Sequence, residues 1–153
     1  MKRYRALILL SAAILLAAHG GAGRENIRVE EVTMHLMDGS ATFELNYSLD
    51  AFTRLYVLAL GCRSLEPELA SILCGYRDVR LIRADLNRAA LLVGDAARYN
   101  GGYYLFESRP LGYGIPRFTV VYPDGQARTY YNVTSTQDVF CTEMPQVLGS
   151  RPR

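Results

Sequence analysis

Apolar and polar residues alternate, imperfectly, along the chain from Ile27 to Leu49, with Asp38-Gly39 between the two runs. A period of two places the apolar side chains of a strand on one face. Asp-Gly between two such runs is typical of a tight β-turn. The pattern therefore predicts a β-hairpin with one buried face and one solvated face. Its second strand has the clearest apolar set: Ala41, Phe43, Leu45, Tyr47 and Leu49.

After Asp50 the spacing of the apolar residues changes to every three or four positions, which is typical of a helix. Asp50 is a favourable N-cap and Gly61 a favourable helix end, so we expect a first helix between them. A buried strand over residues 55–60 is the alternative, because that run is almost wholly apolar. The helical stripe consists of Phe52, Leu55, Tyr56 and Ala59.

A second helix is expected before Gly75, with Pro67 in its first turn, where proline is well tolerated. The two helices are predicted to cover one face of a sheet. The apolar stripe of the second helix consists of Leu65, Leu69, Ile72 and Leu73.

The rest of the chain is rich in short strand signals separated by tight-turn residues such as Pro123-Asp124-Gly125. Short turns join antiparallel strands, since a parallel crossover needs a dozen or more residues. We therefore expect an α+β fold with an antiparallel sheet of about six to seven strands and a helical pair packed on one face. A small β-barrel or sandwich with an inserted helix is the alternative. The strand segments are 79–86, 89–93, 103–107, 117–122 and 127–133.

The N-terminus has the layout of a secretory signal peptide. The basic residues Lys2, Arg3 and Arg5 precede an apolar run over 6–18, and small residues follow it up to Ala22. We expect cleavage after Ala22. The alternative is a retained anchor, because the uncharged stretch 6–23 approaches the roughly 17–20 residues that span a membrane.

This division predicts three parts of the chain. Residues 1–22 form a signal peptide or N-terminal membrane anchor, residues 23–143 a single globular α+β domain, and residues 144–153 a flexible tail. The expected location is extracytoplasmic, either secreted or anchored by the N-terminal segment.

Charge argues against a nucleic-acid partner. The whole chain has 17 Lys and Arg against 15 Asp and Glu, but the N-terminal segment carries three of the cations, so 14 against 15 remain in the domain. A near-neutral domain lacks the basic surface that binding to phosphate backbones requires.

Three cysteines in an exported protein allow one internal disulfide and leave one thiol over. A helix between Cys62 and Cys74 would hold them about 15 Å apart, too far for the roughly 7 Å of a disulfide. The candidate bridge therefore joins Cys141 to Cys62 or Cys74, and three free thiols are the alternative. With His35 the only histidine after the N-terminal segment, no metal site is predicted.

Two N-x-S/T sequons, at Asn46 and Asn132, become candidate glycosylation sites if the chain is exported. Both asparagines fall in expected strands. Chance occurrence is the alternative explanation.

The sequence contains no nucleophile elbow, zinc-protease motif, phosphate loop or dinucleotide fingerprint. Its compositional excess is tyrosine, with 11 residues, a side chain that combines apolar area with a hydroxyl group. The segment 109–116 is read as a loop and is the candidate binding loop, because loops commonly carry binding sites. Ordinary packing of tyrosines in a sheet is the alternative. The candidate binding residues are Arg109, Tyr113, Tyr104 and Tyr131.

Several short runs are similar to those of uncharacterised short exported proteins of methanogenic archaea. The resemblance spans most of the expected domain and implies export and a shared fold, without an activity. It rests on residues 52–58, 65–67, 102–104, 120–125 and 132–136.

These observations favour a non-enzymatic cell-envelope or secreted module that binds a surface protein or glycan, with no cofactor and with membrane contact only through the N-terminal segment. One alternative is a structural subunit of an envelope assembly. The other is an enzyme or enzyme accessory whose cleft is built from scattered residues, namely His35, Asp85, Glu107 and Arg109.

Overall fold

The computed structural model describes residues 26–142 of the chain. The predicted signal peptide or anchor and the predicted tail lie outside the described residues. Within them, the buried apolar side chains from both helices and from both sheets form one hydrophobic core. The α+β class is confirmed.

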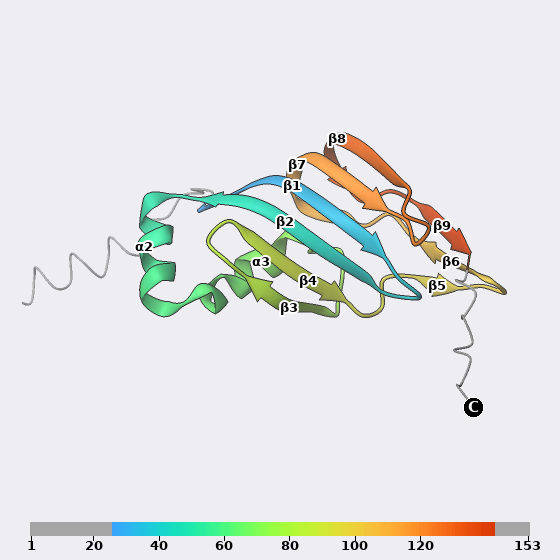
Figure 1. Cartoon of the computed structure of the whole chain (residues 1–153), viewed down its shortest axis with the longest axis horizontal. Coiled ribbons are helices and arrows are strands. Elements are labelled where there is room, and N and C mark those ends of the chain that lie inside the picture. Colours follow the sequence, from blue (N-terminus) through green and yellow to red (C-terminus); the bar gives the residue numbers. More distant parts are fainter. Residues whose placement is uncertain (1–25, 143–153) are drawn as a thin grey trace, which may run out of the picture.

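The main sheet has six strands in the order β3-β4-β2-β1-β7-β8 and does not close into a barrel (Figure 1). The first strand of the chain therefore lies inside the sheet, while β3 and β8 form its edges. The strands are β1 (Ile27–Leu36), β2 (Ala41–Leu49), β3 (Val79–Ala84), β4 (Arg88–Val93), β7 (Pro110–Val121) and β8 (Ala127–Ser135).

The prediction of a purely antiparallel sheet was wrong, because β1 and β7 pair in parallel, from Glu31 opposite Arg117 to His35 opposite Val121. The rule that short turns give antiparallel neighbours holds only for strands that follow each other in sequence. Here five strands, the two α-helices of the described residues and η1 lie between β1 and β7 and together form a long crossover.

A second, three-stranded antiparallel sheet has the order β5-β6-β9. Its strands are β5 (Arg98–Tyr99), β6 (Tyr103–Phe106) and β9 (Val139–Thr142). Only β6 was expected from the sequence. Figure 1 places this sheet at the end of the molecule opposite to helix α2.

The predicted hairpin is confirmed, with β1 and β2 paired antiparallel around Asp38-Gly39. Gly39 has a φ of 73°, a left-handed conformation that glycine adopts at little cost. The alternation sorts the side chains as expected, since Val32, Met34 and Phe43 are almost fully buried.

The two predicted helices are present as α2 (Ala51–Leu60) and α3 (Glu66–Ile72), joined by a 3-10 turn, η1 (Cys62–Leu65). The Asp50 side chain accepts a hydrogen bond from the Thr53 N–H at 2.6 Å, and Gly61 ends α2 with a φ of 90°. The strand alternative for residues 55–60 is thereby excluded.

Both helices were expected to cover one face of the sheet, but only α3 packs on it. Its side chains Leu69 and Ile72 are fully buried. A Cβ placed on Gly112 of β7 would lie 2.2 Å from the Ser71 carbonyl oxygen of α3, so strand and helix approach with no room for a side chain. The expectation that both helices cover the sheet was therefore wrong for α2.

Tyr47 of β2 gives the fold a pH dependence. Its buried hydroxyl donates to the Asp85 carbonyl oxygen at 2.5 Å. Burial raises its pKa to about 12, and the Cys62 and Asp85 charges act in the same direction. Because the folded state holds this proton more tightly than the unfolded chain, with its pKa of 10.0, the stabilisation is complete below pH 10 and is lost as the pH rises through about 12.

We expect chemical denaturation between pH 9 and pH 12 to show this loss in the wild type and to show less of it in Tyr47→Phe, which has no proton to release there. At neutral pH the variant should be less stable by about 1 kcal/mol, for the lost hydrogen bond. If the free energy of unfolding changed with pH in the same way in both proteins, the raised pKa of Tyr47 would be contradicted.

Candidate functional site

Helix α2 exposes most of its large apolar side chains, including Phe52 and Leu55 of the stripe that was expected to be buried. Phe52 is 78% exposed, Leu55 66%, Leu58 65% and Leu60 62%. Val57 is the one buried residue of the helix. Surface apolar residues are ordinary when single, but a contiguous group of large ones marks a contact surface. We call these four residues, together with the half-exposed Tyr56, the α2 surface.

The exposure follows from where α2 lies. Figure 1 shows it at one end of the long axis of the molecule, running across that axis. It follows β2 at its N-terminus and continues into η1 at its C-terminus. With caps at both ends and mostly good helix formers between them, the helix is specified locally and needs no covering partner within the domain.

The α2 surface adjoins the place where the N-terminal part of the chain joins the domain. The N–H of Asp50, the N-cap of α2, donates to the carbonyl oxygen of Asn26 at 3.3 Å. A cavity of about 240 Å³ lies between this junction and the helix, with Ile27, Phe52 and Tyr56 among its lining residues. The N-terminal segment and α2 therefore begin at the same corner of the domain.

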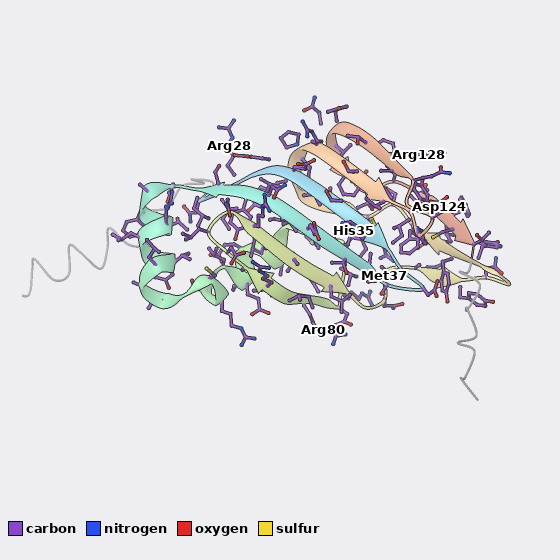
Figure 2. The ribbon with its side chains drawn as sticks, in the orientation of Figure 1. Arg28, His35, Met37, Arg80, Asp124 and Arg128 are labelled. Atoms are coloured by element: carbon purple, nitrogen blue, oxygen red, sulfur yellow. The ribbon has the colours of Figure 1, made fainter. Side chains whose placement is uncertain are left out.

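Charged side chains of both signs lie on α2 and on the elements next to it in the chain. Arg54 on the helix and Arg63 on η1 are exposed, and Figure 2 shows Arg28 extending away from the sheet near the start of β1. The exposed Glu66 and Glu68 begin the next helix. The surface is thus apolar with a rim of mixed charge.

The segment 109–116, read as a loop from the sequence, is mostly the irregular first half of strand β7. That interpretation was wrong. Glycines at 112 and 114 resemble a turn in sequence, but Gly112 serves the close approach of α3. No binding loop exists at this position.

The four candidate binding residues do not form one group. Tyr113 lies on β7 and Tyr131, 68% exposed, on β8, where it is opposite Arg117. Tyr104 belongs to the second sheet and packs on Tyr99, with ring centroids 5.2 Å apart. Arg109 pairs with Glu107 at 3.7 Å. They are spread over both sheets.

The four residues of the enzyme alternative are also separated. Glu107 and Arg109 line one cavity of about 340 Å³, beside Tyr76, whose pKa is raised by burial. Asp85 lines a different cavity, and the Nε2 atom of His35 lies 3.8 Å from a Glu44 carboxylate oxygen on the outer sheet face. An acid, a base and a binding group do not converge on one cleft among these four.

All three cysteines lie in the described part of the chain, and all are free thiols. Cys141 is buried on β9 opposite Tyr104, and burial raises its pKa. Cys74 contacts the Pro110 carbonyl oxygen, and Cys62 lies in η1 beside α2. The candidate bridge from Cys141 to Cys62 or Cys74 is absent from this structure, in which Cys141 packs in the hydrophobic core.

The two sequon asparagines differ in accessibility. Asn132 is exposed on the edge strand β8, with a φ of 52° that asparagine tolerates better than most residues. Asn46 lies half-buried on β2, inside the sheet, and its side-chain amide donates to Glu31 at 3.3 Å. Of the two, Asn132 is the better placed to accept a glycan.

Comparison with models of protein families, with curated proteins and with solved structures finds no match to this chain. Over residues 26–142, no helix has the length and apolar character needed to cross a membrane, and no three metal-ligating side chains of the His, Cys, Asp and Glu types are grouped for an ion.

Sequence reasoning identified helix α2 but not its role. The signal was available in residues 51–60, where apolar residues occur on every side of the helix instead of on one stripe. A helix that is apolar all round must be covered on more than one side. Because α2 lies at the end of an open sheet, the domain can cover only one side of this helix.

Proposed function

We propose that this protein is a non-enzymatic module of the cell envelope, exported by its N-terminal segment, which acts by docking through the α2 surface on a neighbouring envelope component. The observation that carries the proposal is the exposure of four large apolar side chains, between 62% and 78%, on one short helix. Water-exposed apolar area of this kind is stabilised when a partner removes it from water.

The separation of the polar candidates supports a non-enzymatic role over the enzyme alternative. General acid-base catalysis needs its groups within hydrogen-bond reach of one substrate position. His35 and Asp85 lie at different places on the sheet, and the Glu107 carboxylate is held between Arg98 at 3.3 Å and Arg109 at 3.7 Å. These two ion pairs give the Glu107 carboxylate a structural role.

Hydroxyl-radical footprinting of the wild-type protein in its native membranes tests the proposal. Phe52 and Phe140 are the same residue type, and in the bare domain they are 78% and 63% exposed. Figure 1 places β9, which carries Phe140, far from α2. We expect Phe52 to be strongly protected in the native membranes while Phe140 is labelled.

Labelling of the same sample after unfolding in guanidinium gives the intrinsic reactivity of each position. If Phe52 is labelled at least as strongly as Phe140 in the native membranes, as their exposures in the bare domain require, the α2 surface is uncovered and the proposal is wrong. The comparison needs no substitution and no knowledge of the partner.

A further inference from the structure

We infer that the component covering the α2 surface is the lipid bilayer that holds the chain's own N-terminal segment, so that this segment is a retained anchor and α2 lies in the membrane interface beside it. The inference rests on the proposed docking role of α2 and names its partner. It adds a second membrane contact to the one expected from the sequence.

The chain between the expected anchor and helix α2 is short. The uncharged stretch 6–23 ends three residues before Asn26, and an extended chain spans at most about 3.3–3.6 Å per residue. Asn26 is hydrogen-bonded to Asp50, the N-cap of α2. A bilayer that contains this stretch therefore has its surface within about 10 Å of Asn26, the residue that bonds to the N-cap of α2.

The position and orientation of helix α2 also favour a bilayer. Helix α2 stands at the end of the molecule, with its axis across the long axis (Figure 1). A plane can meet such a helix along its whole length without touching the second sheet. A protein partner for a single apolar helix would instead need a groove to receive it.

The α2 surface is small for an interface between two copies of the chain. A stable interface between two copies takes about 20–30 residues on each side, whereas the α2 surface has five large apolar side chains. Interfacial helices bind through a small apolar face that enters the boundary between headgroups and acyl chains by about 5–10 Å. The size of the α2 surface fits the bilayer better than it fits a second copy.

The charged side chains near the α2 surface also fit a lipid interface. Arg54 and Arg63 have side chains long enough to keep their charge at the headgroups while their stems lie along apolar surface. Glu66 and Glu68 offset this positive charge. Docking is therefore apolar in character, and we expect it on zwitterionic lipid and with little dependence on salt.

Tryptophan fluorescence tests the inference directly, because the chain contains no tryptophan. Leu58→Trp places a probe on the α2 surface, and Phe140→Trp places the matched control at a site of nearly equal exposure, 63% against 65%, at the other end of the molecule. Each full-length variant is reconstituted in phosphatidylcholine vesicles with and without brominated acyl chains. Circular dichroism establishes that each variant is folded.

We expect the Leu58→Trp emission to shift to shorter wavelength and to lose most of its intensity with brominated lipid, at low and at high salt. Phe140→Trp should do neither. A short-wavelength shift without quenching would show that residues 1–25 or a second copy cover the helix, and would overturn the inference. So would emission from Leu58→Trp equal to that of the control.

The intact mass of the protein extracted from native membranes tests the retained anchor. A mass that includes residues 1–22 is expected, and a chain that begins after Ala22 would overturn the inference. If Phe52 is protected in native membranes but the tryptophan of Leu58→Trp is not quenched, the docking function stands and the lipid partner is wrong. If Phe52 is not protected, both are wrong.

Discussion

Phe43→Ala is expected to lower the free energy of unfolding by about 3–5 kcal/mol, whereas Phe52→Ala should change it by less than about 0.5 kcal/mol. The chemical change is the same at both positions. Phe43 is 0% exposed, lies opposite Met34 and Leu91 in the sheet, and packs on Tyr76 with ring centroids 5.3 Å apart. Its loss leaves a cavity in the core. Phe52 is 78% exposed and leaves none.

Urea denaturation of the two variants and the wild type, in detergent-free buffer or in one common detergent, measures both differences. The pair is a test of the exposed α2 surface as much as of the core. Similar destabilisation by both substitutions would mean that α2 packs against the domain in solution, and the docking proposal would lose its basis.

Gly112→Ala is expected to destabilise the domain by about 1–3 kcal/mol, the usual range for a side chain added where there is no space. The new Cβ would lie 2.2 Å from the Ser71 carbonyl oxygen, so the backbone of α3 or of β7 must move. Because α3 contributes Leu69 and Ile72 to the core, the shift would loosen packing beyond the site of substitution.

Gly114→Ala is the matched control, two residues along the same strand. Its Cβ would meet no atom within 4 Å, and its φ is not in the left-handed region. There the substitution should stabilise by about 0.4–1 kcal/mol, because alanine restricts the unfolded chain. Thermal unfolding compares the two. Equal effects would contradict the close approach of β7 and α3.

The elements that sequence predicted well are those specified by neighbouring residues. The hairpin follows from alternation around Asp38-Gly39, and α2 begins and ends at its expected caps, Asp50 and Gly61. The segment 109–116 was misread because its glycines have a turn-like composition. The reason for Gly112 is the backbone of a helix some 40 residues earlier, and a local pattern cannot contain that reason.

The candidate site was harder to predict than the fold. Periodicity shows which side chains of α2 share a face, but burial depends on what stands opposite that face in three dimensions. For α2 the sheet ends before it reaches the helix, so Leu55 and Leu58 meet solvent while Val57 meets the core. The tyrosine excess likewise could not show that Tyr104 and Tyr131 belong to different sheets.

The parallel pairing of β1 with β7 sets the order in which the chain can fold. Glu31 and Arg117, which pair across these strands, are 86 residues apart. Contacts this distant in sequence form late, since the loop between them must close first. A chain that is synthesised from its N-terminus therefore cannot complete its six-stranded sheet until β7 has followed.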